Sequence, residues 1–170
     1  MANNLSSIMS TLMSSDALKA IAKTSGIDAS DVSKVLTSAL PELISGASKQ
    51  STSKKTAESF ATALEDHGSK SISNLTSFFK NVDIEDGSKI VSHLLGTSSQ
   101  TKAKSISKSS GIDAKTVTTI MATAAPLLMS VLGKQTQAQK KKSESTTASI
   151  ASALLSNVDV GGIINSFLKK

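Results

Sequence analysis

Several residue types are missing from this sequence, and their absence excludes some kinds of catalytic and binding site. It contains no cysteine, no tryptophan, no tyrosine and no arginine, and only four phenylalanines and two prolines among 170 residues. The absence of cysteine excludes disulfides, thiol catalysis and cysteine-ligated zinc. The absence of arginine removes the side chain best suited to paired hydrogen bonds with carboxylates, phosphates and guanine. Lysine is therefore the basic side chain available for binding an anionic partner.

The residues that are present favour helices. Hydrophobic residues make up 38% of the chain, so a core can form, and it must be built from Leu, Ile, Val, Met and Ala because aromatic residues are scarce. With only nine glycines and two prolines the chain has few turn-forming residues. No segment alternates apolar and polar residues for long enough to predict a sheet. We predict an all-α protein.

Membrane and export signals are weak in this sequence. No uninterrupted apolar run approaches the ~18 residues that a membrane span needs. The first basic residue is Lys19, so the N-terminus lacks the charged start of a signal peptide. We expect no membrane span and a cytoplasmic protein, with export that needs no leader as the open alternative.

The chain repeats itself at an offset of 85 residues. Residues 21–51 (IAKTSGIDASDVSKVLTSALPELISGASKQS) align without gaps to residues 106–136 (ISKSSGIDAKTVTTIMATAAPLLMSVLGKQT). A match of this length predicts a multihelical array of two pseudo-repeated helical units. We divide the chain into an N-terminal helical segment (1–15), a first repeat unit (16–97) and a second, shortened unit (98–170).

Each copy carries the same helix signals. Gly26 and Gly111 can end a short helix in the left-handed conformation, and Asp28 and Asp113 stand where the next helix needs an N-cap. The long helix that follows has one apolar face in each copy, formed by Val32, Val35, Leu36, Ala39, Leu40, Leu43 and Ile44 in the first and by Val117, Ile120, Met121, Ala124, Ala125, Leu128 and Met129 in the second. This apolar phase continues across Pro41 and Pro126, which favours one kinked helix over two separate helices.

Further apolar stripes predict the remaining helices. They lie in residues 57–64, 72–79, 90–95, 150–155 and 163–168, with Asp86 as the expected cap of the helix that Gly96 closes. Before the repeat, Leu5, Ile8, Met9 and Leu12 form a stripe that packs either on the core of the chain or on a neighbouring molecule. Both alternatives are open at this point.

With these motifs in view, the sequence resembles the bacterial domain-of-unknown-function 937 family, to which the YidB-like proteins are related. The resemblance is carried by DGSKIVSHLLG at 86–96, by SSGIDAKTVTTIMATAAPLLMSVLGKQ at 109–135 and by ALPELISGASKQ at 39–50. It implies a multihelical fold without an assigned activity, and no catalytic or ligand residues to transfer. The Ser- and Lys-rich composition of this chain differs from the Gly- and Leu-rich appearance that is usual in the family.

Few residues could support catalysis. His67 stands at a predicted helix end, where it can cap carbonyl groups, and His93 stands at the edge of an apolar stripe, so we interpret both as structural. Two histidines without cysteine give no metal-ligand spacing. The acidic cluster of Asp83, Glu85 and Asp86 precedes a helix, where it suits capping and the helix dipole. We predict that the chain is not an enzyme and needs no cofactor.

The positive charge is concentrated in the second half of the chain. Residues 1–85 hold 8 Lys and 9 acidic residues, whereas residues 86–170 hold 11 Lys and 4 acidic residues, so the formal net charge of +6 comes from −1 and +7. The densest lysines, which are candidate anion-binding residues, are Lys134, Lys140, Lys141 and Lys142. We expect a helical binding or self-assembly module with itself or another protein as partner. Nonspecific binding of nucleic acid or an anionic surface through these lysines is the alternative.

Overall fold

The computed structural model describes residues 4–140 and is all-α over that part of the chain. The stripes predicted beyond residue 149 lie outside the described residues, as do the first three residues. The elements are α1 (Asn4–Leu12), α2 (Ser15–Ser25), α3 (Ala29–Thr52), α4 (Ala57–Gly68), α5 (Leu75–Lys80), α6 (Ile84–Leu95), the short 3-10 helix η1 (Gly96–Ser98), α7 (Ser99–Ser110) and α8 (Ala114–Lys140).

The two aligned stretches fold locally as predicted, each as a short helix, a glycine turn and a long helix. Gly26 and Gly111 adopt the left-handed conformation, with φ of 72° and 75°. Pro41 and Pro126 both lie inside long helices. Every residue of the two predicted apolar faces is buried, and one hydrophobic core includes residues from both predicted units.

The N-caps follow the prediction only in part. Asp113 accepts a hydrogen bond from the amide of Thr116 at 2.9 Å, whereas Asp28 occupies the cap position of α3 without a side-chain hydrogen bond. Asp86 does not cap α6, which was the expectation. The helix begins earlier, at Ile84, because the carboxylate of Asp83 accepts from the amides of the next two acidic residues. The helix predicted at 72–79 likewise begins only at Leu75.

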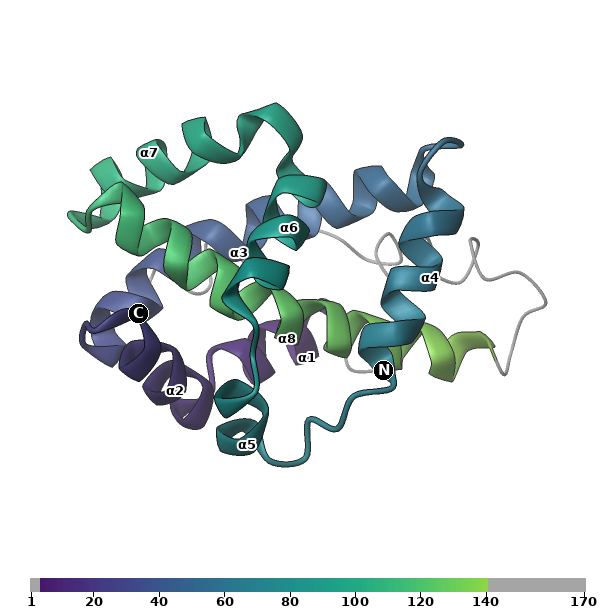
Figure 1. Cartoon of the computed structure of the whole chain (residues 1–170), viewed down its shortest axis with the longest axis horizontal. Helices are drawn as coiled ribbons and strands as arrows, with labels where there is room; N and C mark the ends of the chain where they lie inside the picture. The colour runs from purple at the N-terminus through teal and green to yellow at the C-terminus, as the bar shows by residue number, and fades with distance from the viewer. Residues whose placement is uncertain (1–3, 141–170) are drawn as a thin grey trace.

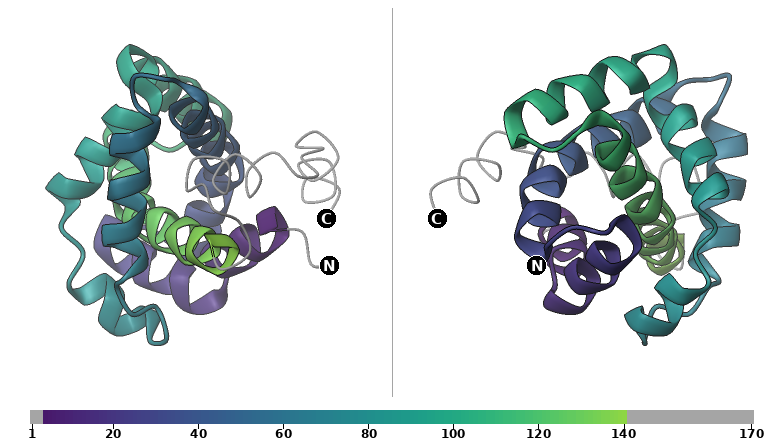
Figure 2. Two further views of the ribbon diagram at one scale, coloured as in Figure 1. Left: turned by 90° about the vertical axis from the view of Figure 1, so that its right-hand side faces the viewer. Right: turned by 60° about the vertical axis from the view of Figure 1, so that its left-hand side comes forward.

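Helix α8 runs through the middle of the molecule and the other long helices pack around it (Figures 1 and 2). It contacts α1, α2, α3, α4, α6 and α7, and every residue from 120 to 133 is buried. By length and composition alone, residues 114–137 could cross a membrane, but 83% of the apolar window is covered by the rest of the chain. In this structure α8 is the core helix.

Glycines allow α4 and α6 to approach α8 closely. Gly87 of α6 lies against the carbonyl oxygen of Ala122, where an added methyl group would collide. Pro126 has no amide hydrogen, so that carbonyl lacks its usual helical donor four residues later. Gly68 of α4 faces Gly133 of α8, and a methyl group at position 68 would lie 2.8 Å from the carbonyl carbon of Gly133. These contacts fix the positions of α4 and α6.

The N-terminal stripe packs on the protein's own core. The side chains of Ile8, Met9 and Leu12 are at most 3% exposed, and α1 contacts α8 and α2. Of the two alternatives left open by the sequence, these three residues follow the intramolecular one.

Candidate functional site

The structure does not gather the predicted anion-binding lysines into a described site. Lys134 lies half-buried on α8. Lys140 is the last residue of that helix, with a side chain outside the description, and Lys141 and Lys142 lie beyond the described residues. The exposed lysines that the structure does describe in this half include Lys104 and Lys108 on α7.

His67 is the buried titratable residue of the described chain. It lies in the last turn of α4 with 9% of its surface exposed. Its Nε2 atom lies 3.9 Å from the Oδ2 atom of Asp86 on α6, and its Nδ1 atom has no hydrogen-bond partner within the described part of the chain. The side chain therefore does not cap carbonyl groups, which was the role considered for it.

The environment of His67 favours its neutral form. Burial lowers the pKa of the imidazole, and the positive charge of Lys70 lowers it further. The carboxylates of Asp86 and Asp66 act in the other direction, but the net shift is downward. His67 is therefore uncharged near neutral pH.

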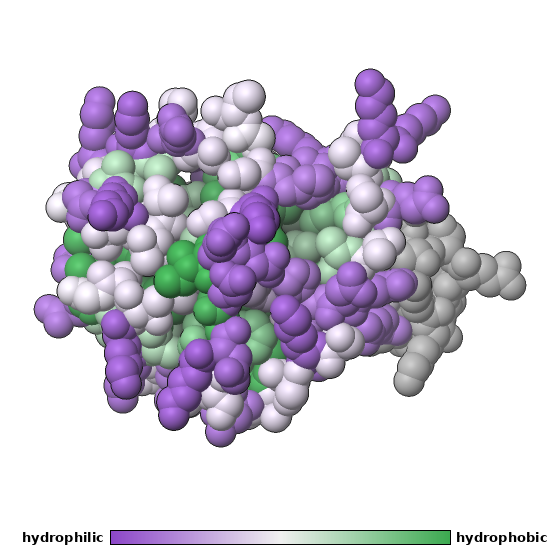
Figure 3. Space-filling view, viewed as in Figure 1, coloured by the Kyte–Doolittle hydropathy of each residue, from purple (hydrophilic) through white to green (hydrophobic). Residues whose placement is uncertain are grey.

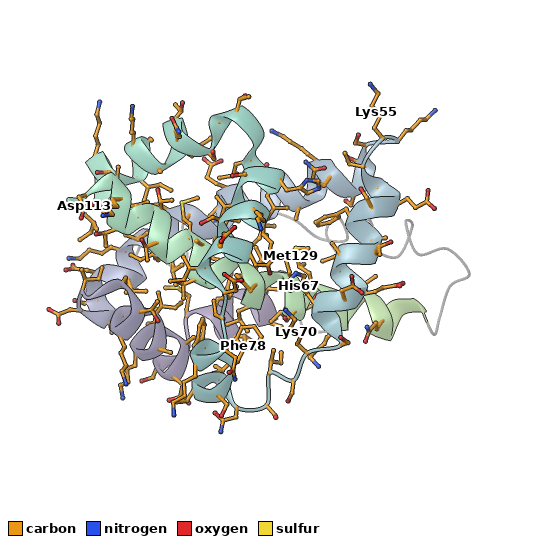
Figure 4. The ribbon with its side chains drawn as sticks, in the orientation of Figure 1. Lys55, His67, Lys70, Phe78, Asp113 and Met129 are labelled. Atoms are coloured by element: carbon orange, nitrogen blue, oxygen red, sulfur yellow. The ribbon has the colours of Figure 1, made fainter. Side chains whose placement is uncertain are left out.

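A groove between α4 and α6 holds both histidines of the chain. Its cavity is about 320 Å³ in volume. Apolar residues of three helices line its floor, and polar residues line its rim; the set includes Phe60, Ala63, His67, Asp86, Lys89, Ile90, His93, Leu94 and Met129. Figure 4 shows His67 and Met129 close to each other near the centre of the molecule. Between residues 4 and 140 no group of three or more histidine and acidic side chains is placed to hold a metal ion.

A second cavity, of about 450 Å³, adjoins this groove and shares Asp86 with it. It lies between the loop after α4, helix α5 and the start of α6, with Pro126 of α8 among its lining residues. Its lining carries both signs of charge. Lys70, in the loop after α4, is positive, and Asp83 and Asp86, at the start of α6, are negative. Figure 4 shows Lys70 between His67 and Phe78.

The face of α6 that points toward α7 is different in character, because it is uncharged. A cavity of about 180 Å³ lies there, lined by Ser88, Val91, Ser92, Ser99, Gln100, Ala103, Thr118 and Met121. One turn before Ser88, on the same face of α6, stands Ile84, which is 39% exposed and is the one exposed large hydrophobic residue of the described chain. Figure 3 shows mostly hydrophobic and weakly polar surface to the left of centre, with the hydrophilic side chains concentrated around it.

Sequence reasoning identified His67, His93 and Asp86 separately but did not bring them together. Their proximity depends on how closely α4 and α6 approach α8, which local periodicity does not report. One signal was available: His67 precedes Gly68 and Asp86 precedes Gly87, the two glycines that touch α8. A glycine within a helical pattern is less favourable than alanine, so it can mark a place where another backbone packs closely.

Comparison with known protein families gives a match over most of the chain. The family model described as "Bacterial protein of unknown function (DUF937)" matches residues 7–135, which is more than half of the chain. No curated protein and no solved structure matches significantly.

Proposed function

Since this chain belongs to the DUF937 family of bacterial proteins of unknown function, we propose that it is a non-enzymatic helical module that binds a second copy of itself. The observation that carries the proposal is the uncharged face of α6, where an exposed apolar side chain stands beside a cavity of matching character. Ile84 is the projecting side chain and the 180 Å³ cavity beside Val91 and Met121 is its receptor.

The spacing of these residues suits a two-fold dimer. Ile84, Ser88 and Val91 are separated by four and three residues, so they follow one face of α6. Ile84 is not among the residues that line the cavity of its own chain, but a second copy can present its Ile84 there. In a two-fold dimer each copy supplies both parts, because the same patch is used twice.

The charge of this face also suits a second copy of the same chain. None of the residues that line the cavity is charged, whereas the whole chain carries a formal net charge of +6. Two copies that met through a lysine-rich surface would repel each other, since like charges placed together are unfavourable. The uncharged face avoids this cost.

The polar residues of the groove favour binding over catalysis. Neither histidine side chain forms a hydrogen bond with a serine or threonine hydroxyl among the described residues, and such a pair is the usual mark of an activated nucleophile. Asp86 lies 3.9 Å from His67, beyond direct hydrogen-bond distance.

Sedimentation velocity tests the proposal on the full chain from micromolar to millimolar concentration. We expect the wild type to shift from monomer to dimer and Ile84→Asp to stay monomeric. Because Ile84 is exposed, the variant should keep the wild-type melting temperature. Thr62→Asp, at an exposed position on α4, is the matched control and should dimerise like the wild type. A wild type that is monomeric throughout, or an Ile84→Asp variant that still dimerises, would overturn the proposal.

The second candidate is nonspecific binding to nucleic acid or an anionic surface. Lys104 and Lys108 project from α7, and Asp113 is the one acidic residue between positions 87 and 140. Such binding depends on counterion release and falls steeply with salt. We expect any binding to duplex DNA or acidic lipid vesicles to be lost when Lys140, Lys141 and Lys142 become Gln. Binding that resists salt or selects a base sequence would contradict it.

A further inference from the structure

The 450 Å³ cavity between α5 and the start of α6 is lined by opposite charges, Lys70 and Asp83, that form no ion pair within residues 4–140. Lys70 forms no ion pair with any acidic residue between positions 4 and 140. Asp83 uses its Oδ1 atom to accept the amides of Glu85 and Asp86, at 2.8 and 3.3 Å, and no described group donates to its Oδ2 atom. Both charges line the same cavity.

The two asparagines of the cavity are held in fixed orientations by their other hydrogen bonds. Asn74 accepts the amide of Ser77 through Oδ1 at 3.0 Å, which leaves its Nδ2 group as a donor. Asn81 donates from Nδ2 to the carbonyl of Ser77 at 2.9 Å, which leaves its Oδ1 atom as an acceptor. The cavity thus offers a donor from Asn74 besides the ammonium of Lys70, and an acceptor from Asn81 besides the carboxylates.

We propose that this cavity binds a small zwitterion, an α-amino acid with an apolar side chain. Its carboxylate would pair with Lys70 and Asn74, and its ammonium group with Asp83 and Asn81. The apolar part of the lining, formed by Phe78, Val82 and Pro126, would receive the ligand's side chain. A ligand with one charge only would leave the other charge of the cavity unmatched.

The location makes this site independent of the proposed dimer. Asp83 and Asp86 line the cavity, whereas Ile84, Ser88 and Val91 follow a different face of α6. Because most of the polar groups are exposed to water, we expect weak, reversible binding that is sensitive to salt.

The test is a titration of the ¹⁵N-labelled full chain with L-leucine, followed by amide chemical shifts. We expect saturable shifts confined to residues 70–86 and the neighbourhood of Pro126. N-acetyl-L-leucine, which lacks the ammonium group, and L-leucinamide, which lacks the carboxylate, should each bind about two- to fivefold more weakly, as for the loss of one charge pair that is exposed to water.

Lys70→Gln should weaken leucine binding by about two- to fivefold, while Lys80→Gln, at an exposed lysine on α5 that does not line this cavity, should bind like the wild type. Both variants change an exposed side chain, so both should keep the wild-type melting temperature. Three results would each overturn the proposal: no saturable shift with leucine, equal binding of the acetylated analogue, or unchanged affinity in Lys70→Gln.

Discussion

Helix pairs α2–α3 and α7–α8 are built from matching sequences, yet the protein uses their long helices differently. In α8 every residue from 120 to 133 is buried, whereas in α3 the aligned stretch from 35 to 48 keeps a half-buried or exposed face. The buried apolar face is shared. The difference lies on the second face, which is fully buried in α8, where α4 and α6 make the most contacts, and is only partly covered in α3.

A few substitutions between the copies account for this difference. At the offset of 85 residues, Thr37 corresponds to Ala122, Glu42 to Leu127 and Ser48 to Gly133. In each pair the residue of α8 is smaller or less polar. Glu42 instead stays half-buried and forms an ion pair with Lys102 at 2.8 Å. The second face of α8 thus carries no charge at the position of Glu42 and has smaller side chains at two positions, both of which suit full burial.

Exchanging the residues of the aligned pair Glu42 and Leu127 should have the largest effect on the free energy of unfolding. Leu127 is fully buried, so Leu127→Glu would place an unpaired charge in the core and should cost more than about 4 kcal/mol or prevent folding. Glu42→Leu breaks only a partly exposed ion pair and should change the free energy of unfolding by less than about 1 kcal/mol. Urea unfolding followed by circular dichroism measures both. Equal costs would refute the assignment of α8 as the core helix.

The glycine contacts should give the next largest effect. Gly133→Ala forces a methyl group against the backbone of α4, which cannot rotate away, and should cost about 1–3 kcal/mol. Ser48→Ala, at the aligned position of α3, is the matched control and should stay within about 0.5 kcal/mol. Gly87→Ala should resemble Gly133→Ala because it meets the carbonyl of Ala122. If both glycine variants unfold at the wild-type urea concentration, the close contacts do not hold the helices.

The two prolines should respond unequally to replacement. Alanine at either position returns a backbone donor, and an interior proline costs about 3 kcal/mol or more. Pro41→Ala should stabilise the protein, since Pro41 lies on the half-buried face of α3, where the helix has room to adjust. Pro126→Ala should stabilise less, because the carbonyl of Ala122 is already packed against Gly87. Urea unfolding and helical content by circular dichroism report the difference, and an equal gain at both sites would contradict it.

The sequence predicts the parts that recur locally in the two copies. The turns at Gly26 and Gly111 and both apolar faces follow from spacing alone. The central position of α8 could not be predicted in this way, because it depends on the distant helices α4 and α6. The same holds for the site: His67 and Asp86 are 19 positions apart and meet only through the contacts of Gly68 and Gly87 with α8.

Acidification should lower the stability of the protein through His67, which lies on α4 where that helix packs against α8. The pKa of His67 is lowered by burial, so below its ordinary value of about 6.5 the unfolded chain binds a proton that the folded chain does not. Stability should therefore be full above that pH and should fall as the pH decreases toward the lowered pKa. His67→Gln should reduce this decline in urea-unfolding experiments between neutral and mildly acidic pH. An undiminished decline in the variant would show that other groups cause it.

The smallest difference should come from the two N-caps. Asp113 accepts the amide of Thr116 at 2.9 Å and its hydroxyl at 2.6 Å, and these bonds, the hydroxyl first, lower the pKa of the Asp113 carboxyl. In the first copy the residue aligned with Thr116 is Asp31, which repels Asp28 instead of donating to it. Asp113→Ala should therefore lower the melting temperature more than Asp28→Ala does, and Asp31→Thr should raise it by letting Asp28 cap α3. The benefit of Asp113 should persist at pH values above the ordinary carboxyl pKa and disappear as the pH falls through the lowered one. Melting curves of the three variants at neutral pH decide the comparison, and equal losses at positions 28 and 113 would show that the hydrogen bonds of Asp113 add nothing to stability.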